Sequence, residues 1–401
     1  MKKTNKKNKA MLNSLLKSEK KIKKFNKKSY YFVLKTKPNT CDKPIVVTEK
    51  KKKKTTWIFL LCNIIIVGAL LVYQFVFGET KPIGELLKES PYYRFLWISL
   101  GMMVVYYLCE ATCYSILLKR ITGKYQFGIG VKTAIVGKYW DSITPFGSGG
   151  QFAQVAYINS KGYKGNTSTS VVVGKYVFFE FAFVILGIVV LCLPCSLFEY
   201  GVVIKWLAFA GVMINLILTT FITLVSTNRK VCAVLVVGGL KLLSKMKIVK
   251  NYNKALFNSL RFIHNYQMSI KAFAKNPLLI IGEVLINALG LIAMAMVSYL
   301  IYLAFNYSPG VPVEHGLIQI LTMTFLCQYA TTFIPIPGGS GAAEVSFAAM
   351  FGKLFDNGAI FWALLFWRLF TYYLFIIVGF IYTVLAPACR KRKNNKITNT
   401  N

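Results

Sequence analysis

The sequence has few acidic residues and little charge of either sign in most of its length. It contains 14 Asp and Glu residues against 49 Lys and Arg residues, which gives a formal net charge of +35. Charged residues make up 16% of the chain, whereas 55% of it is hydrophobic. A soluble domain would spread more charge over its surface, and a disordered chain would hold fewer apolar residues. The composition therefore excludes both of these classes.

Motifs for disulfides, metals and common catalytic machinery are also scarce. The nine Cys residues form no cluster with the two His residues, and several lie within apolar runs, as Cys62, Cys109 and Cys192 do. We interpret them as small apolar residues rather than as a secreted disulfide scaffold. The chain has no Walker A motif, no GxSxG elbow and no HExxH motif. We therefore expect no catalytic residue, no bound metal and no cofactor.

The positive charge is concentrated at the N-terminus. Residues 1–56 hold 20 of the Lys and Arg residues and 3 of the acids. Such a segment cannot bury apolar area, so we predict a disordered cytoplasmic tail. It is attracted to an anionic membrane surface by about 1 kcal/mol per charge, and this partner is favoured over a nucleic acid. Residues 387–401 form a second, shorter basic tail that we also place in the cytoplasm.

The remainder is dominated by long apolar stretches. A membrane helix needs about 20 mostly apolar residues in a row. Six stretches meet this requirement: 57–77, 91–118, 168–193, 202–226, 277–305 and 359–386. Two further apolar stretches, 133–158 and 317–350, are interrupted by Pro and Gly. Backbone that is broken in this way cannot face lipid, because its amide groups would have no partners. It must lie against protein or line a wet cavity.

The charges of the loops indicate whether the interrupted stretches cross the membrane. If both crossed, the loop 227–276, with ten Lys and Arg residues, would lie outside the cell. That would contradict the rule that short cytoplasmic loops carry the positive excess. If both turn back, every loop agrees with the rule. We therefore predict an all-α polytopic membrane protein with six full spans, two re-entrant broken helices and cytoplasmic termini.

The two interrupted stretches also suggest an inverted repeat. Pro145 and Pro335 are 190 residues apart. One span precedes each break and another span follows it, at matching distances. The transmembrane domain, 57–386, would then contain two units, 91–193 and 277–386, with the second upside down. Inverted repeats with broken helices are a recurring plan in transporters. Coincidence is the alternative, since Gly and Pro are common in membrane helices.

Each Gly-rich break is followed by a predicted helix start, near Gln151 and near Ala342, with Ser148 and Ser340 as caps. A helix start presents free N–H groups and the positive end of the helix dipole, so it favours anions such as phosphate. The alternative is a packing contact in which Gly lets helices approach. The predicted lipid-headgroup cavity includes Thr144, Pro145, Gly147, Ser148, Gly149, Gly150, Gln151, Pro335, Pro337, Gly338, Gly339, Ser340 and Gly341.

Charged residues inside the spans extend this candidate cavity. They are rare and costly in lipid, and they mark functional sites by default. Lys175 and Arg368 are candidates to contact a lipid phosphate, while the acids would receive a cationic group or a proton. A purely structural ion pair between Glu344 and Arg368 is the alternative. The charged residues assigned to the cavity are Glu110, Lys175, Glu180, Glu344 and Arg368, and Glu283 receives no role.

The motifs at 144–151 and 335–344, together with Trp367–Arg368 and the Tyr-rich run after it, resemble those of one known family. This is the lysylphosphatidylglycerol synthase transmembrane region, also called the flippase-like domain family, and the resemblance covers about 57–386. It implies a bacterial cell-membrane protein that moves a phospholipid between leaflets. Long members also carry a soluble domain that transfers lysine to phosphatidylglycerol, which leads to resistance to cationic antimicrobial peptides.

The sequence ends at Asn401, fifteen residues after the last predicted span, so we expect the soluble transferase domain to be absent. The leading hypothesis is a translocator of a phospholipid or of an aminoacylated phospholipid such as lysylphosphatidylglycerol. The second is a phosphatidylglycerol lysyltransferase, acting alone or with a soluble lipid-modifying enzyme as a separate partner. The third is a membrane scaffold that binds lipid and a partner protein.

Overall fold

The computed structural model describes residues 92–144, 147, 149–193, 202–245, 255–256, 259, 266–267, 269–306, 315–331, 341–355 and 359–385. Within these ranges the regular elements are all helices, and there is no strand. The predicted span at 57–77 and both basic tails lie outside the described residues. The all-α fold class is thus confirmed for the part of the chain that contains the candidate site.

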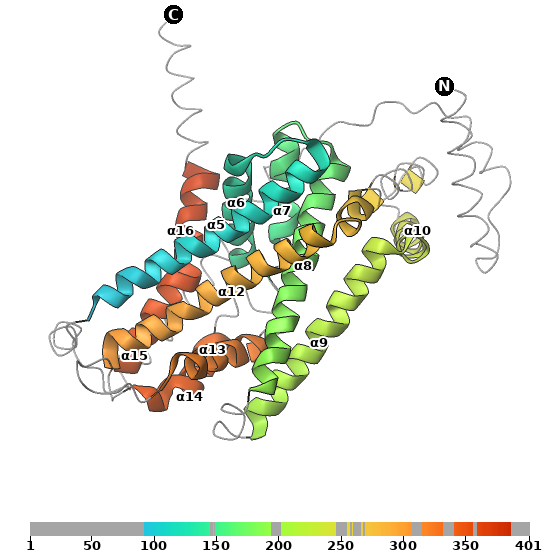
Figure 1. Ribbon diagram of the computed structural model, residues 1–401. Helices are drawn as coiled ribbons and strands as arrows, with labels where there is room; N and C mark the ends of the chain where they lie inside the picture. The colour runs from blue at the N-terminus through green and yellow to red at the C-terminus, as the bar shows by residue number, and fades with distance from the viewer. Residues whose placement is uncertain are drawn as a thin grey trace, which may run out of the picture.

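Long apolar helices form the body of the protein (Figure 1). They are α5 (Arg94–Thr122), α8 (Gly165–Cys192), α9 (Val202–Thr227) and α12 (Pro277–Asn306). The last long helical segment joins α15 (Ala359–Arg368), a π-helical turn (Leu369–Tyr373), α16 (Leu374–Phe380) and a second π-helical turn (Ile381–Leu385).

By length and composition, five described segments can cross a membrane: 94–122, 165–192, 208–227, 277–306 and 359–383. They coincide with five of the six predicted spans. The chain is therefore a multi-pass membrane protein, and the total of six spans stays a prediction.

Each interrupted stretch forms a pair of short helices that pack against each other. The first pair is α6 (Phe127–Ile143) and α7 (Gly149–Ser160), and the second is α13 (Leu317–Thr331) and α14 (Ala342–Phe351). The first pair lies at the upper end of Figure 1, where α5 ends and α8 begins, and the second lies at the lower end. The interrupted stretches thus turn back from opposite ends of the bundle, as the loop charges predicted.

Each hairpin packs against a spanning helix of the other predicted unit. The α6 helix of the first unit packs on α16 of the second, and α13 of the second packs on α8 of the first. The first helices of the two units, α5 and α12, pack along each other. In Figure 1 they run in opposite directions. These contacts place each hairpin next to spanning helices of the other predicted unit, and the inverted repeat itself stays a prediction.

Glycine allows the closest helix crossings around the first hairpin. A Cβ on Gly130 would lie 2.3 Å from the carbonyl oxygen of Ala111 on α5, and a Cβ on Gly379 would lie 2.3 Å from the Cβ of Tyr139 on α6. Either contact is much shorter than van der Waals contact permits. Small residues let membrane helices approach in this way, and here they hold α6 between α5 and α16.

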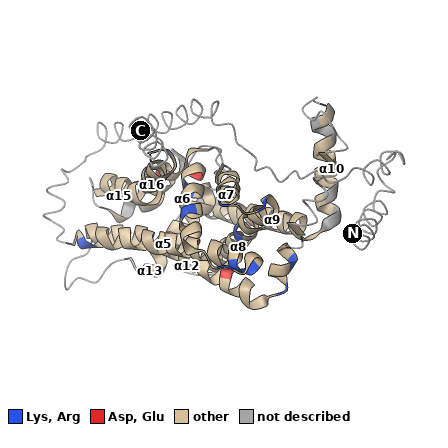
Figure 2. Cartoon of the chain, turned by 90° about the horizontal axis from the view of Figure 1, so that it is seen from above, with Lys and Arg blue, Asp and Glu red and all other residues tan. Residues whose placement is uncertain are grey.

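The segment after α9 lies across the axis of the spanning helices. The α10 helix (Arg229–Lys245) turns away from α9 and extends beyond the bundle when seen from above (Figures 1 and 2). Farther along, the hydroxyl of Tyr266 donates a 2.9 Å hydrogen bond to Ser226 Oγ near the end of α9. Burial raises the pKa of Tyr266 to about 12, so this phenol stays a neutral donor at physiological pH.

Candidate functional site

Four charged side chains from three helices form a charge cluster around the first hairpin. They are Glu110 on α5, Lys138 and Asp141 on α6, and Lys175 on α8. Lys175 Nζ forms an ion pair with Glu110 Oε1, and both side chains are buried. Lys138 interacts electrostatically with Glu110 and with Asp141. The cluster thus carries two cations and two carboxylates within an apolar helix bundle.

Aromatic rings hold the two ammonium groups of the charge cluster. Lys138 Nζ lies 5.0 Å from the ring centroid of Tyr106 and 5.8 Å from that of Phe179. Lys175 Nζ lies 4.7 Å from the same Phe179 ring. A cation over a desolvated aromatic face gains about 2 kcal/mol. The Phe179 ring is therefore shared by both lysines and fixes their relative positions.

Sequence reasoning missed Lys138 and Asp141, although it had selected Glu110 and Lys175. The buried charges predicted from the sequence lie in the uninterrupted spans and in the stretch 317–350, and none of them lies in 133–158. The available signal was a cation and an acid three residues apart in an apolar segment, a spacing that puts both on one face of a helix. Their place beside Glu110 and Lys175 depends on how α6 packs against α5 and α8.

At the first break, the last turn of α6 caps the start of α7. The Gly149 N–H donates to Thr144 Oγ1 at 2.9 Å, and the Gly150 N–H donates to Asp141 Oδ1 at 2.9 Å. A Cβ on Gly150 would lie 2.1 Å from the Asp141 carboxylate, so only glycine fits this approach. These two amides of the predicted anion site already have partners within the protein.

The described residues of the first break lie around this cap. Gly147 adopts a left-handed φ of 58°, which glycine accepts without a steric penalty. The α7 helix begins at Gly149, two residues before the predicted start, and Gln151 is partly buried in its first turn. Pro145 and Ser148 lie outside the described residues, so the role of Ser148 as a cap stays a prediction.

At the second break, Glu344 connects the start of α14 to the last spanning segment. Its Oε2 accepts a 2.5 Å hydrogen bond from the Gly341 N–H, and its Oε1 lies 2.7 Å from Arg368 Nε. The helix starts at Ala342, as predicted, and Gly341 occupies the cap position that had been assigned to Ser340. The ion pair between Glu344 and Arg368 is therefore present, and both of its members are buried.

The remaining residues of the second break lie outside the described residues. Gly341 is described and adopts a left-handed φ of 88°, which agrees with a Gly-rich turn before α14. The predicted residues that lie outside the described ranges are Pro335, Pro337, Gly338, Gly339 and Ser340.

Arg368 sits where the last spanning segment changes its geometry. The π-helical turn begins at the next residue, and such turns are often found at functional sites. The Arg368 guanidinium lies 4.9 Å from the Trp367 ring and 5.5 Å from the Tyr372 ring. The Tyr372 hydroxyl donates a 3.0 Å hydrogen bond to the carbonyl oxygen of Ser142 on α6. This bond ties the segment that carries Arg368 to the first hairpin.

Lys175 and Arg368 lie at similar positions along the helices that follow the first and the second hairpin. Lys175 is the eleventh residue of α8, and Arg368 is the tenth residue of α15. Each cation is paired with a carboxylate, but the carboxylates come from different places. Glu110 lies on the first helix of its unit, whereas Glu344 lies in the hairpin of its unit. The two units therefore offer related but not identical charged sites.

Glu180 faces another part of the bundle. Its Oε2 atom accepts a 3.5 Å hydrogen bond from the Thr219 hydroxyl on α9. The Glu180 carboxylate also interacts with the hydroxyl of Tyr176 one turn earlier. It interacts with Lys175 as well, which keeps it at the edge of the charge cluster. The structure thus joins Glu110 and Lys175 directly, with Glu180 oriented toward α9.

Nothing in the described part of the chain is arranged to hold a metal: no three His, Cys, Asp or Glu side chains come together. The sequence does contain one Cys-x-x-Cys spacing, at Cys192 and Cys195. This spacing is an exception to the interpretation of the cysteines as apolar residues. Cys192 is exposed at the end of α8, and Cys195 lies outside the described residues.

Comparison with known proteins agrees with this architecture. A protein of Mycoplasma pneumoniae (strain ATCC 29342 / M129 / Subtype 1) that bears the name "Uncharacterized protein MG306 homolog" is 22% identical over 310 residues, which cover 71% of this chain and 75% of that protein. No solved structure matches the chain. The family model described as "Lysylphosphatidylglycerol synthase TM region" matches residues 60–379, a range that includes both hairpins and every charged residue of the site. The chain therefore belongs to the family of the lysylphosphatidylglycerol synthase transmembrane region.

Proposed function

We propose that this protein moves a phospholipid, or an aminoacylated phospholipid such as lysylphosphatidylglycerol, between the two leaflets of a bacterial cell membrane. The observation that carries the proposal is the charge cluster, formed by Glu110, Lys138, Asp141 and Lys175 beside a broken helix. Ionised groups are expensive inside a membrane, and those that occur there face a partner or a cavity. A polar headgroup crossing the bilayer needs such partners.

The chemistry of the cluster suits a headgroup that carries both a phosphate and an amine. Lys138 and Lys175 supply positive charge for a phosphate, and Asp141 and Glu110 supply negative charge for an ammonium group. Without a substrate these groups satisfy one another, so that no isolated charge is left in the apolar bundle. A zwitterionic headgroup can exchange with the internal pairs without leaving a charge unpaired.

The second unit provides a related pair at the opposite hairpin. Arg368 is fixed between Glu344 and two aromatic rings. Hairpins that turn back from opposite ends bring one such pair toward each leaflet, which is the arrangement expected for alternating access in an inverted repeat. We place the end that carries α10 in the cytoplasm because the loop 227–276 holds ten Lys and Arg residues.

Lipid movement is tested by reconstitution of the purified protein into liposomes that contain a fluorescently labelled phospholipid in both leaflets. A membrane-impermeant quencher reports how fast labelled lipid from the inner leaflet becomes accessible. Arg368→Ala removes a fixed cation, so it should slow this movement strongly, whereas Arg94→Ala removes an exposed cation at the start of α5 and serves as the matched control. Full activity of a well-folded Arg368→Ala protein would remove the role given to that residue.

A second candidate function is the transfer of lysine to phosphatidylglycerol, alone or with a soluble partner enzyme. The family match supports it because the family is named after a synthase. Purified protein supplied with lysyl-tRNA and phosphatidylglycerol should form no lysyl-lipid if translocation is its sole activity. Formation of lysyl-lipid by a clean preparation would favour the transferase instead.

A further inference from the structure

Glu283 on α12 is a buried acid for which neither proposed function has a use. Its side chain is 1% exposed, and neither carboxylate oxygen has an N–H or O–H donor in the described part of the chain. Asn287, one turn later, donates through Nδ2 to the Glu283 carbonyl oxygen at 2.8 Å and to Cys113 Sγ on α5 at 3.3 Å. The Asn287 Oδ1 atom also lacks a partner there.

The Glu283 carboxylate and Asn287 Oδ1 are thus buried acceptors one turn apart on α12. In the described part of the chain, the group that interacts with the carboxylate as a hydrogen-bond partner is the Cys113 thiol on α5, which is a weak donor. Buried polar atoms in native proteins are almost always paired, so an acceptor-only group of this kind indicates a missing proton or cation. A sodium ion would need several more oxygen ligands than the two side chains provide. A proton on Glu283 meets the need directly, because a protonated carboxyl group carries an O–H donor.

The surroundings of Glu283 make its charge important for substrate binding. The charged and titratable groups that interact with it are Cys113 and Glu110 on α5 and Lys175 on α8. Within the described residues, the other helices packed on α12 contribute no charged or titratable group that acts on Glu283. The charge cluster is neutral when Glu110, Lys138, Asp141 and Lys175 are ionised, so an ionised Glu283 would leave one uncompensated negative charge. A phosphate group that entered beside it would then be repelled.

We propose that Glu283 is a proton-binding site, and that one proton travels with each lipid whose headgroup is a net anion, such as phosphatidylglycerol, so that movement of such a lipid is an electroneutral cotransport. This inference rests on the proposed lipid movement and names its energy source. The proton occupies one Glu283 oxygen before the phosphate approaches Lys175, and it leaves together with the phosphate.

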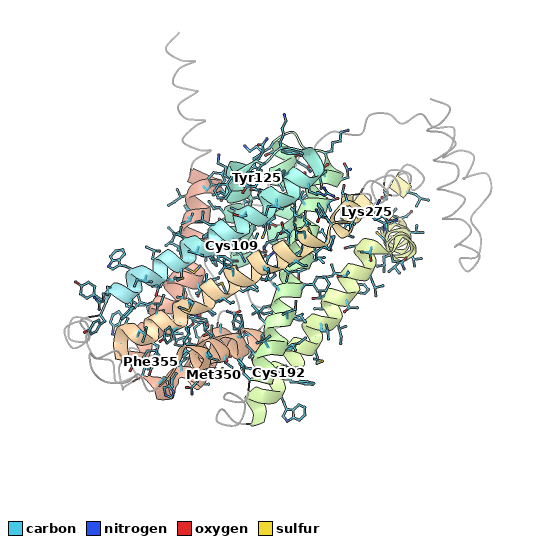
Figure 3. The ribbon with its side chains drawn as sticks, viewed as in Figure 1. Cys109, Tyr125, Cys192, Lys275, Met350 and Phe355 are labelled. Atoms are coloured by element: carbon cyan, nitrogen blue, oxygen red, sulfur yellow. The ribbon has the colours of Figure 1, made fainter. Side chains whose placement is uncertain are left out.

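The position of Glu283 indicates the end of the bundle with which it exchanges its proton. Glu283 is six residues after Pro277, so it lies about 9 Å along the helix from the start of α12. Figure 3 labels Lys275 just before that start and Cys109 on the facing helix α5, one turn before Cys113. The start of α12 is at the end of the bundle that carries the first hairpin. Glu283 therefore exchanges its proton with that end, which we place in the cytoplasm.

The transport test uses phosphatidylcholine liposomes that contain labelled phosphatidylglycerol, with an imposed pH gradient. Cotransport of one proton per lipid should concentrate the label in the leaflet on the alkaline side, up to about tenfold for each pH unit. A membrane potential set with potassium and valinomycin should have no effect. Glu283→Gln should abolish the response to the pH gradient, and Ser298→Ala, a buried polar change farther along α12, should retain it.

Infrared spectroscopy of the full-length protein tests proton binding without any transport. The C=O band of a protonated carboxyl group should be present at neutral pH, should be lost in Glu283→Gln and should remain in Ser298→Ala. Absence of that difference would overturn the inference. Lipid movement that ignores the pH gradient, or that follows a sodium gradient, would also overturn it while the proposed function stood. If no lipid moves at all, the proposed function fails, and the infrared difference alone decides whether Glu283 holds a proton.

Discussion

Removal of one member of the buried pair between Glu110 and Lys175 should destabilise the protein far more than removal of both. When one partner of a buried pair is lost, the other is left as an uncompensated charge, at a cost of about 3–5 kcal/mol. Lys175→Met should lie at the upper end of this range, because it also removes the contact between the ammonium group and the Phe179 ring at 4.7 Å. Glu110→Gln should lie lower, because a neutral amide still accepts a hydrogen bond from Lys175.

The double variant carries neither charge, so most of the cost should disappear. Replacement of a buried pair by neutral side chains of similar size is often nearly neutral for stability. The destabilisation of the double variant should therefore fall at least about 2 kcal/mol below the sum of the two single effects. Its lipid transport should nevertheless stay low, because the cation that we assign to the phosphate is absent.

Unfolding in mixed detergent micelles, followed by tryptophan fluorescence, measures these free energies. Lys161→Met is the matched control, because Lys161 is an exposed lysine in the short segment before α8, and it should change stability by less than about 0.5 kcal/mol. If both single variants unfold like the control, or if their effects simply add, the pair does not stabilise the fold in the way described. A double variant with full transport would refute the binding role of the pair.

Three further predictions test helix packing, the charge cluster and the membrane topology. Gly379→Ala should destabilise the protein by about 1–3 kcal/mol in the same unfolding assay, because the new Cβ would meet Tyr139, whereas Gly282→Ala, which meets nothing within 4 Å, should not. Lys138→Met should slow movement of labelled lipid and leave the protein folded in size-exclusion chromatography. In a cysteine-free background, single cysteines at 162 and 229 should react with an impermeant maleimide only after the cells are opened, and labelling of intact cells would contradict the cytoplasmic assignment.

Local sequence features were sufficient to predict the spans and their interruptions. Runs of about 20 apolar residues set the positions of the long helices, and Pro and Gly at 144–150 and 335–341 set the places where helices end and restart. The loop charges then selected hairpins over additional spans, because the alternative put the loop 227–276 on the wrong side. These features depend on composition and on the membrane as a solvent, so they could be read without a structure.

The partner of each buried charge depended on tertiary packing. The pairing of Arg368 with Glu344 was foreseen as one option, because both residues are close to the second break. The pairing of Lys175 with Glu110 was not foreseen, because the residues are 65 positions apart and meet only where α8 crosses α5. Sequence periodicity indicates which face of a helix is polar, but not which of several neighbouring helices that face will meet.

The helix starts show the same division most clearly. The sequence alone located Gly-rich breaks and therefore predicted helix N-termini with free amides for an anion. The structure placed Asp141 and Thr144 on the first of these starts and Glu344 on the second, so that the protein's own oxygens accept from the N–H groups of Gly149, Gly150 and Gly341. The sequence determined where the amides would be, because Gly and Pro act locally on the backbone. Only the tertiary structure decided what binds them, because that depends on which side chains the folded hairpins bring within hydrogen-bond reach.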